Sequence, residues 1–515
     1  MAHQFLSFCL FVVLVAGSAL ARDHDHPSVR AAKPHPLKYE AERKTEFWIN
    51  KAQDTLAQKL EQTETASTKK AKNIIMFLGD GMSVHTVTAT RNLMGDSSQQ
   101  VYFEKFPYLG LSKTYCVDRQ VADSACTATA YLGGVKGNYG TIGVNANVKR
   151  YHCTDGQNPA NWVDSIAKWA QDAGKDAGLV TTARVTHASP AGVYAHTAQR
   201  GWENDADIMS ANCSPKDNVD IARQLVEWDV GRKLKVIMGG GRRNFIDASV
   251  RDEEGIRGER ADGRNLINEW LEDKRNQNVN ASYAWSRKGL NMLDLDNTEY
   301  LLGLFSSSHC PYHGDLARGH IALANPSLSE MTEAALKVLK KNDKGFFLFV
   351  EGARIDMAHH DTRARKSLED TEEFAKSVRV AREMFSEDDT LIVVTSDHSH
   401  TMTINGYPFR DQDITGLANG PAEDNLPYTI LSYANGPGYY STYGPNGRKL
   451  ITTKDTQNAK FEYMATVPLD SETHGGDDVG VFASGPYAQY FSGNYEQTNI
   501  PSMMAKAANI GPFAN

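Results

Sequence analysis

The chain has 515 residues, of which 41% are hydrophobic, so it can bury a large core as one big domain or two. Its 55 basic and 63 acidic residues give a formal charge of −8, which supplies neither a basic face for nucleic acid nor a polybasic patch for a membrane surface. We therefore expect no nucleic-acid partner.

The first segments of the chain are predicted to serve export and linkage. Residues 5–21 form an apolar run, FLSFCLFVVLVAGSALA, whose end has the small-residue pattern of a signal-peptide cleavage site. The run is too short for a good membrane span, so residues 1–21 are predicted to be a secretory signal peptide. Residues 22–38 are polar and contain prolines, which predicts disorder, and residues 39–63 have the pattern of an amphipathic helix.

Export would expose the chain to glycosylation and oxidation. The sequons at Asn212 (NCS) and Asn280 (NAS) are candidate glycan sites. After Cys9 leaves with the signal peptide, the remaining cysteines are Cys116, Cys126, Cys153, Cys213 and Cys310. Their odd number predicts at least one free thiol and one or two disulfides. The C-terminal residues lack the hydrophobic tail of a GPI signal, so we expect a secreted, extracellular protein without a membrane anchor.

An alternation of strands and helices begins at residue 73. Short apolar runs stop abruptly at Asp, Glu, His or Gly: NIIMFLGDG (73–81), GLVTTARVTHASP (178–190), KVIMGGGRRNF (235–245), GFFLFVEGARID (345–356) and TLIVVTSDHSH (390–400). Helical patterns such as 327–341 and 367–385 lie between them. This alternation predicts an α/β fold with a mostly parallel central sheet flanked by helices on both faces. Residues 406–469, rich in Gly, Pro, Tyr and Asn, are expected to form a small, crown-like accessory insertion.

The polar residues that end these runs are candidate metal ligands. Ligands of parallel sheets bind beyond the carboxyl ends of the strands. The candidates there are Asp80, Glu351, Asp356, His359, His360, Asp397, His398 and, late in the chain, His474. Each has a plain structural explanation, since GDG is a turn signal and an Asp-His pair usually lies in a surface loop. Together they form the oxygen and nitrogen set that zinc accepts, with enough carboxylates for several ions, magnesium among them.

The segment VADSACTATAY (121–131) carries a candidate nucleophile. Asp and Ser are preferred N-cap residues, so the segment alone predicts only a helix start. A serine at that place also lies where backbone N–H groups and the helix dipole favour negative charge, and it can be both cap and nucleophile beside a divalent ion. Arg200 is a candidate to hold phosphate oxygens through its bidentate guanidinium.

Six ordered segments resemble the hallmark segments of animal alkaline phosphatases of the invertebrate type: KNIIMFLGDGM, VADSACTATAY, VTHASPAGVYAHTAQR, FVEGARIDMAHH, VTSDHSH and ETHGGDDV. The resemblance covers residues 39–505 and leaves 506–515 as a tail. It implies metal-dependent hydrolysis of phosphate monoesters at alkaline pH, with a broad substrate range and a covalent phosphoserine. It also implies two zinc ions and one magnesium ion per subunit, and a homodimer whose interface includes the N-terminal helix and the 406–469 insertion.

The resemblance further implies a role for each matching residue. Ser124 would be the nucleophile, with Arg200 gripping the phosphate and Asp123 orienting Arg200. The implied ligands are Asp356, His360 and His474 for one zinc, Asp80, Asp397 and His398 for the other, and Asp80, Ser189 and Glu351 for magnesium, with His187 just outside that last set. Cys153 and Cys213 match a disulfide of the family.

Some positions depart from the family pattern. Met357 stands where the family commonly has a basic or imidazole residue near the phosphate, so product affinity and turnover are expected to differ. The carboxylates of a mammalian calcium-type site appear here as Ser306 and Asn325, so calcium is not predicted. Cys126 replaces a smaller residue beside the nucleophile; burial as an inert thiol is favoured over a site of thiol sensitivity, and any pairing of Cys116, Cys126 and Cys310 stays open.

Two other functions are weighed against this one. A sulfatase would need a C/S-x-P-x-R context that Ser124 lacks, and a phosphodiesterase more often has threonine there and lacks the magnesium position that Ser189 and Glu351 fill. Relative rates on mono- and diesters separate these activities. A catalytically silent extracellular binding protein would usually have lost a nucleophile or a ligand, and failure to bind zinc would favour it. The motifs name neither the physiological substrate nor the tissue.

Overall fold

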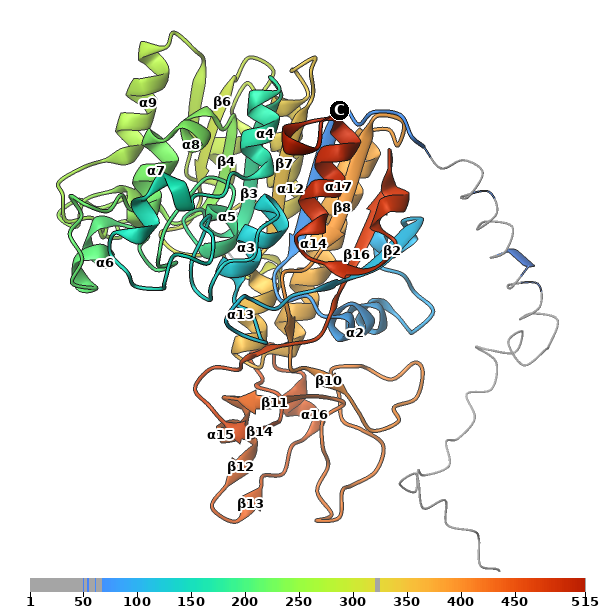
Figure 1. The fold of residues 1–515 in the computed structure, drawn as a ribbon. Coiled ribbons are helices and arrows are strands. Elements are labelled where there is room, and N and C mark those ends of the chain that lie inside the picture. The colour runs from blue at the N-terminus through green and yellow to red at the C-terminus, as the bar shows by residue number, and fades with distance from the viewer. Residues whose placement is uncertain (1–49, 51–52, 55–60, 62–66, 320–324, 515) are drawn as a thin grey trace, which may run out of the picture.

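A ten-stranded sheet forms the centre of the fold, in the strand order β17-β2-β16-β8-β1-β7-β3-β4-β6-β5 (Figure 1). The structure is a computed structural model that describes residues 67–319 and 325–514, together with 50, 53, 54 and 61. The predicted signal peptide and linker, and nearly all of the helix predicted over 39–63, lie outside the described residues.

Most of the sheet is parallel, and its strands follow the apolar runs. The parallel strands are β1 (Asn73–Gly79), β3 (Asp176–Arg184), β4 (Val236–Gly240), β5 (Ala281–Ala284), β6 (Tyr300–Leu304), β7 (Phe346–Gly352) and β8 (Thr390–Thr395). At one edge β16 (Val479–Ser484) runs antiparallel to β8 and to β2 (Tyr108–Lys113), and β17 (Gly493–Glu496) pairs with β2. All residues of β1, β7 and β8 are buried, because parallel strands are covered on both faces. The predicted α/β class is confirmed.

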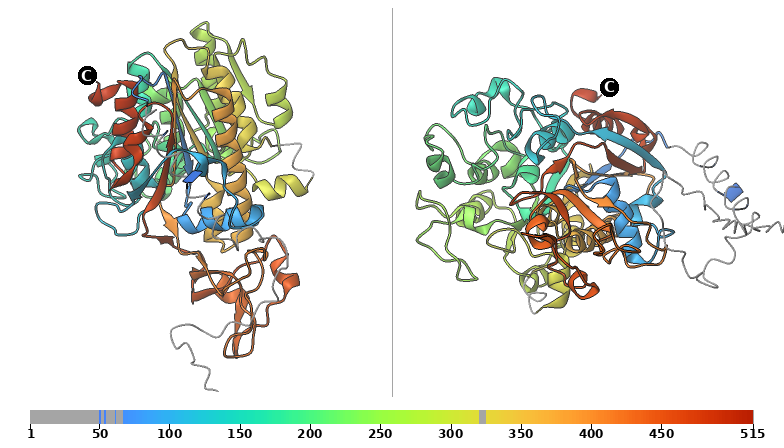
Figure 2. Two further views of the ribbon diagram at one scale, coloured as in Figure 1. Left: turned by 90° about the vertical axis from the view of Figure 1, so that its right-hand side faces the viewer. Right: turned by 90° about the horizontal axis from the view of Figure 1, so that it is seen from below.

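Helices cover both faces of the sheet (Figure 2). The two largest hydrophobic cores lie on opposite faces: Ile74, Met76 and Leu78 of β1 belong to one, and Ile75 and Phe77 to the other. Helices of the first core include α3 (Ser124–Gly133), α4 (Ile166–Asp172), α5 (Ala188–Ala191), α7 (Ile221–Glu227), α8 (Asp229–Lys233), α9 (Leu266–Asn276) and α17 (Asn499–Ala508). Helices of the second include α2 (Val84–Met94), α10 (Arg287–Asn291), α12 (Leu328–Leu339), α13 (Arg354–His360) and α14 (Ala364–Met384). Two short helices, α6 (Asp205–Ser210) and α11 (His313–Arg318), lie in connections. Among the residues that the structure describes, no helix is long and apolar enough to cross a membrane.

Residues 403–468 form a small unit with its own core, which Figure 1 shows beyond α13. Its strands are β10 (Thr403–Ile404), β11 (Leu431–Gly436) and β14 (Ala465–Pro468) in one sheet, and β12 (Tyr443–Gly444) and β13 (Gly447–Arg448) in a hairpin; α15 (Gly438–Thr442) and α16 (Thr453–Thr456) are its helices. Ile430 and Tyr463 pack in its core together with Leu368 of α14, so the unit is fixed to the end of the main domain where α14 begins.

The structure contains two disulfides. Cys153 pairs with Cys213 as the family resemblance implies, with the two Cα atoms 5.6 Å apart. Cys116 pairs with Cys126 at a Cα–Cα distance of 5.9 Å. The expected burial of Cys126 is confirmed, but the residue is a disulfide partner and not an inert thiol, because the loop after β2 returns to the first turn of α3. Cys310 is free and buried, and burial raises the pKa of its thiol to about 12.

Helix α14 contains a buried carboxyl group away from the polar strand ends. Asp370 is only 7% exposed and accepts hydrogen bonds from the backbone N–H of His313 at 3.2 and 3.3 Å. Burial raises the pKa of Asp370 to about 8; Arg354 opposes the shift, and the charges of Glu369 and Glu373 add to it. This pKa is higher in the folded than in the unfolded protein. The contribution of Asp370 to the stability of the fold is therefore fully present below about pH 4 and is lost as the pH rises through about 8.

Asp370→Asn is therefore expected to stabilise the protein by about 3–5 kcal/mol at pH 9 and by only about 1–2 kcal/mol at pH 5, since the amide keeps the shape of the protonated acid but cannot ionise. Urea unfolding midpoints at the two pH values measure the effect. Glu372→Gln, an exposed position on the same helix, is the matched control and should change both midpoints equally and slightly. Equal changes at both pH values in Asp370→Asn would contradict the prediction.

Candidate active site

The sheet order brings the polar strand ends together. Strands β8, β1 and β7 are neighbours and parallel, so the residues that follow them meet at one edge. Asp80 follows β1, Asp397 and His398 follow β8, and Glu351 lies near the end of β7, ahead of α13. Together with α13 and with residue 474, these positions contain all of the candidate zinc and magnesium ligands except Ser189, which lies on α5 after β3.

Asp356, His360 and His474 converge on one point. The Nε2 atoms of the two histidines are 3.1 Å apart, and each lies 3.4 Å from Oδ1 of Asp356. Their Nδ1 atoms face backbone carbonyls, that of Glu472 at 2.5 Å from His360 and that of Ala122 at 2.8 Å from His474. Each Nδ1–H can donate to its carbonyl, which leaves the Nε2 lone pair free for a cation.

His400 also faces Asp356, although no role was predicted for it. Its Nε2 lies 2.7 Å from Oδ1 of Asp356, and its Nδ1 lies 2.5 Å from Oε2 of Glu472. Burial alone would lower the pKa of His400, but the charges of Glu472 and Asp356 and its hydrogen bonds to them raise it to about 10. A usable signal was the H-x-H spacing of His398 and His400, because β9 (Ser399–His400) pairs with β15 (His474–Gly475) and places His400 opposite His474.

A second group consists of Asp80, Asp397 and His398, all fully buried. The Nε2 of His398 lies 3.1 Å from Oδ2 of Asp397 and 3.6 Å from Oδ1 of Asp80. The Ser124 hydroxyl lies 3.1 Å from the same Nε2, so the candidate nucleophile is directly beside this group. Burial and the charges of Asp356 and Asp397 raise the pKa of Asp80 well above its ordinary value.

The carboxylates and hydroxyl predicted for magnesium are buried without partners. In the part of the chain that the structure describes, both Oδ atoms of Asp80, Oγ of Ser189 and Oε1 of Glu351 have no hydrogen-bond partner, and neither does Oδ2 of Asp397. The other oxygen of Glu351 accepts from the Thr181 hydroxyl at 2.5 Å, and burial raises the pKa of Glu351 to about 8. Unpaired buried carboxylates are costly, and divalent cations would satisfy them, so the donor sets fit bound metals.

Asp123 connects the nucleophile segment to Arg200. It is the N-cap of α3 and accepts from the backbone N–H of Cys126 at 3.3 Å, so Ser124 is the first helical residue and not the cap. The same Oδ1 accepts from the backbone N–H of Gly140 at 2.9 Å, and Oδ2 pairs with Nη1 of Arg200 at 2.9 Å. Burial would raise the pKa of Asp123, but Arg200 and these backbone donors lower it, so the carboxylate stays ionised.

His187 supports the other side of the guanidinium. Its Nε2 lies 3.3 Å from Nη2 of Arg200. Burial, together with the charges of Arg200 and Arg184, lowers the pKa of His187 well below its usual range. A neutral His187 can therefore accept a hydrogen bond from Arg200.

Some candidate residues lie outside these groups. Both ring nitrogens of His359 are hydrogen-bonded to hydroxyls, Nε2 to Ser367 at 2.7 Å and Nδ1 to Tyr433 at 2.8 Å, so this histidine supports the packing of α13. Met357 is half-buried, with its Sδ 2.8 Å from Nη1 of Arg354. At the calcium-type position, the Asn325 amide donates to the Ser306 hydroxyl at 2.7 Å.

Comparison with known proteins agrees with this geometry. The family model described as alkaline phosphatase matches residues 71–510. A membrane-bound alkaline phosphatase of Bombyx mori is 47% identical over 513 residues, covering 96% of this chain and 92% of that protein. An alkaline phosphatase of Gadus morhua is 45% identical over 488 residues, covering 92% of this chain and 98% of that protein. The solved alkaline phosphatase from the Antarctic bacterium TAB5 covers 86% of this chain and 99% of its own, with a TM-score of 0.58 at 21% identity, which shows a shared fold.

Proposed function

Because this chain belongs to the alkaline phosphatase family and is a metal-dependent phosphomonoester hydrolase, we propose that it acts through a phosphoserine formed on Ser124. The observation that supports this most is the position of the Ser124 hydroxyl. It lies 3.1 Å from Nε2 of His398 in the second ligand group, at the first residue of α3. The N-terminal N–H groups of that helix favour the negative charge of an attacking oxygen.

The reaction is a double displacement at phosphorus. Ser124 Oγ gives up its proton as it attacks the phosphorus atom, the bond to the alcohol oxygen breaks, and that oxygen takes up a proton from solvent, so the alcohol leaves neutral and the protons balance. Water then attacks the phosphoserine, which releases inorganic phosphate and restores the serine hydroxyl. Arg200 holds two phosphate oxygens, because Asp123 and His187 fix the plane of its guanidinium and leave further N–H donors free.

We assign two zinc ions and one magnesium ion to the three donor sets. Zinc fits the nitrogen-rich sets, Asp356 with His360 and His474, and Asp80 with Asp397 and His398. Magnesium fits the all-oxygen set of Asp80, Ser189 and Glu351, with His187 nearby. When bound, closely spaced divalent ions stabilise the attacking and leaving oxygens of an in-line displacement. Calcium is not part of the proposal, because the neutral Ser306 and Asn325 supply no carboxylate.

A homodimer and export are also proposed. The 403–468 unit exposes large apolar side chains, with Tyr407 51%, Tyr440 53% and Leu450 65% exposed, which favours a contact with a second copy. The signal peptide pattern of residues 1–21 supports export, and we propose secretion, whereas the Bombyx mori relative is named membrane-bound. Asn212 and Asn280 are exposed, as glycan acceptors must be.

Rates on two nitrophenyl esters test the proposed reaction class. At alkaline pH, kcat/KM for p-nitrophenyl phosphate is expected to exceed that for bis(p-nitrophenyl) phosphate by about 10³-fold or more, since a site built for a phosphate dianion leaves donors unpaired on a diester. Comparable values would favour a diesterase. Zinc binding without hydrolysis of either ester would favour a silent binding protein.

A further inference from the structure

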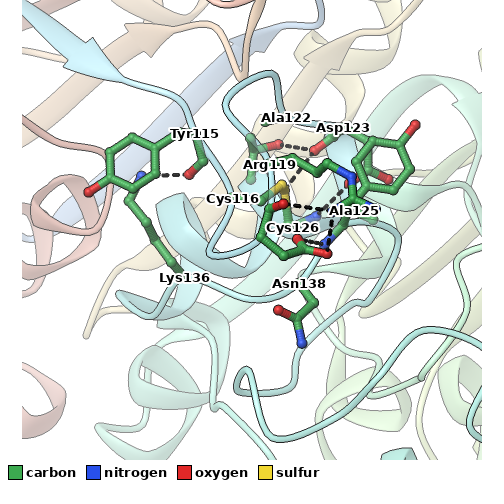
Figure 3. Close-up of a disulfide and its surroundings, with 12 residues drawn as sticks. Tyr115, Cys116, Arg119, Ala122, Asp123, Ala125, Cys126, Lys136 and Asn138 are labelled. Atoms are coloured by element: carbon green, nitrogen blue, oxygen red, sulfur yellow. Dashed lines mark hydrogen bonds and ion pairs between the residues drawn. A yellow bond between two sulfur atoms is a disulfide. The ribbon is translucent and has the colours of Figure 1, made fainter.

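The Cys116–Cys126 disulfide lies beside Asp123 and Ala125 (Figure 3), the two residues that flank the candidate nucleophile Ser124 in the chain. Cys126 is the third residue of α3, and Cys116 follows the strand β2, which lies second from the edge of the sheet. Both cysteines are 2% exposed and pack with Ala122 and Tyr139 in a small separate cluster. The disulfide closes a loop between residues 10 apart in sequence, and Ser124 is inside that loop.

Consecutive residues inside this loop contact three parts of the active site. The carbonyl of Ala122 accepts a hydrogen bond from Nδ1 of His474 at 2.8 Å, and this bond orients a candidate zinc ligand. Asp123 pairs with Arg200 at 2.9 Å, and Ser124 faces the second ligand group. Any shift of residues 122–124 therefore changes the nucleophile, the phosphate grip and one metal ligand together.

The outer part of the same loop has few other apolar contacts. Val117 is 55% and Val121 is 40% exposed. Residues 117 and 118 are held to the neighbouring segment 136–140 by two polar contacts: Val117 N–H donates to Gly137 O at 3.1 Å, and Tyr139 N–H donates to Asp118 Oδ1 at 2.8 Å. A loop with little buried apolar surface opens at low free-energy cost, so the covalent link is the strongest constraint on residues 116–122.

Segment 136–140 also joins the loop to Arg200. Gly140 N–H donates to Asp123 at 2.9 Å, and the Gly140 carbonyl accepts from the backbone N–H of Arg200 at 2.9 Å. Asp123 thus contacts the side chain of Arg200 directly and is connected to its backbone through Gly140. Orientation of Arg200 depends on where the disulfide-linked first turn of α3 places this carboxylate.

We propose that the Cys116–Cys126 disulfide is a positioning element for phosphate binding, which holds Asp123, and through it Arg200, in the orientation that receives the phosphate. The proposal rests on the phosphate-binding role assigned to Arg200 above. Without the disulfide, residues 116–124 would lose conformational entropy when phosphate binds, and this cost lowers the affinity for phosphate.

The variant pair that tests the proposal removes one disulfide at a time. In Cys116→Ala/Cys126→Ala, the Kd of inorganic phosphate is expected to rise about tenfold or more, with a matching rise in KM and a smaller change in kcat. Cys153→Ala/Cys213→Ala is the matched control: its link spans 60 residues, so its loss should lower the melting temperature more but leave the phosphate Kd unchanged. An unchanged Kd in the first variant, or equal changes in both, would overturn the proposal.

A double-mutant cycle shows whether the disulfide acts through Asp123. Asp123→Asn alone is expected to weaken phosphate binding, and loss of the Cys116–Cys126 link in that background is expected to add less than about twofold, because both changes act on the same contact. Additive effects would show that the disulfide acts elsewhere and would overturn the proposal.

Two further measurements keep these results interpretable. Calorimetric titration of inorganic phosphate into metal-loaded Ser124→Ala protein, with and without the Cys116–Cys126 link, measures binding without the covalent step, so a failure of the phosphoserine mechanism is distinguishable from a failure of this proposal. If the alanine pair does not fold, folded protein is reduced with a phosphine and alkylated, and mass spectrometry identifies the opened link. Phosphate Kd must then rise in molecules opened at Cys116–Cys126 and not in those opened at Cys153–Cys213.

Discussion

Replacement of Ser124 by alanine is expected to lower kcat/KM for p-nitrophenyl phosphate by about 10³-fold or more, because the alanine side chain cannot form the covalent intermediate. The Ser124 hydroxyl lies 3.1 Å from Nε2 of His398, and Ser124 is the first residue of α3. Alanine keeps the helix start, since the cap is supplied by Asp123. The Ser124→Ala protein should therefore keep its fold and its metal content, and the loss of activity should arise from the chemical step.

Steady-state kinetics, metal analysis and trapping of the phosphoenzyme check this prediction together. Acid quenching with labelled inorganic phosphate is expected to leave label on the wild-type protein and none on Ser124→Ala. Ser286→Ala is a suitable control, because this serine caps the distant helix α10 and its loss should cost about 1 kcal/mol of stability without changing the rate. Hydrolysis or labelling at wild-type levels in Ser124→Ala would mean that another group is the nucleophile.

Chelation of the metals is expected to abolish hydrolysis and to lower the melting temperature by roughly 5–15 °C. Among the described residues, both carboxylate oxygens of Asp80, the Ser189 hydroxyl and one carboxylate oxygen each of Glu351 and Asp397 have no hydrogen-bond partner, so without cations like charges face one another in a dry site. Burial raises the pKa of Glu351 to about 8, and burial and neighbouring carboxylates also raise that of Asp80.

The pH dependence of the metal-free protein follows from these directions. A raised pKa means that the folded state binds the proton more tightly, so the stability is present at acidic pH and is lost as the pH rises through about 8 for Glu351. The drop in melting temperature on chelation should therefore be larger at pH 9 than at pH 6. Thermal scans with EDTA and with zinc and magnesium added back measure it, and Glu351→Gln should reduce the pH dependence. An equal drop at both pH values would contradict this account.

Local structure was largely readable from the sequence. The apolar run at 73–81 contains β1 (Asn73–Gly79), and the helical pattern at 327–341 contains α12 (Leu328–Leu339). These elements are predictable because a strand or helix buried against both neighbours needs apolar residues at a fixed period. Strand β2 and its neighbour β17, which forms the edge of the sheet, were not predicted, since both bury few of their side chains and leave a weaker pattern.

The chemistry of the site was readable only in part. Carboxylates and histidines at strand ends indicated metals, and the resemblance to a family supplied the role of each residue. His400 and Glu472 escaped this reasoning, because their contact with each other and with Asp356 depends on the pairing of β9 with β15.

By itself, then, the sequence determined the α/β class, the residues that end the strands and the family to which they belong, because these depend on side-chain periodicity and local motifs. Tertiary structure decided which distant residues meet: the neighbouring order of β8, β1 and β7, the contact of His400 with Asp356, and the bond between Cys116 and Cys126. Such contacts join segments far apart along the chain or across an irregular loop. They depend on strand order and on loop closure, which no local spacing of residues encodes.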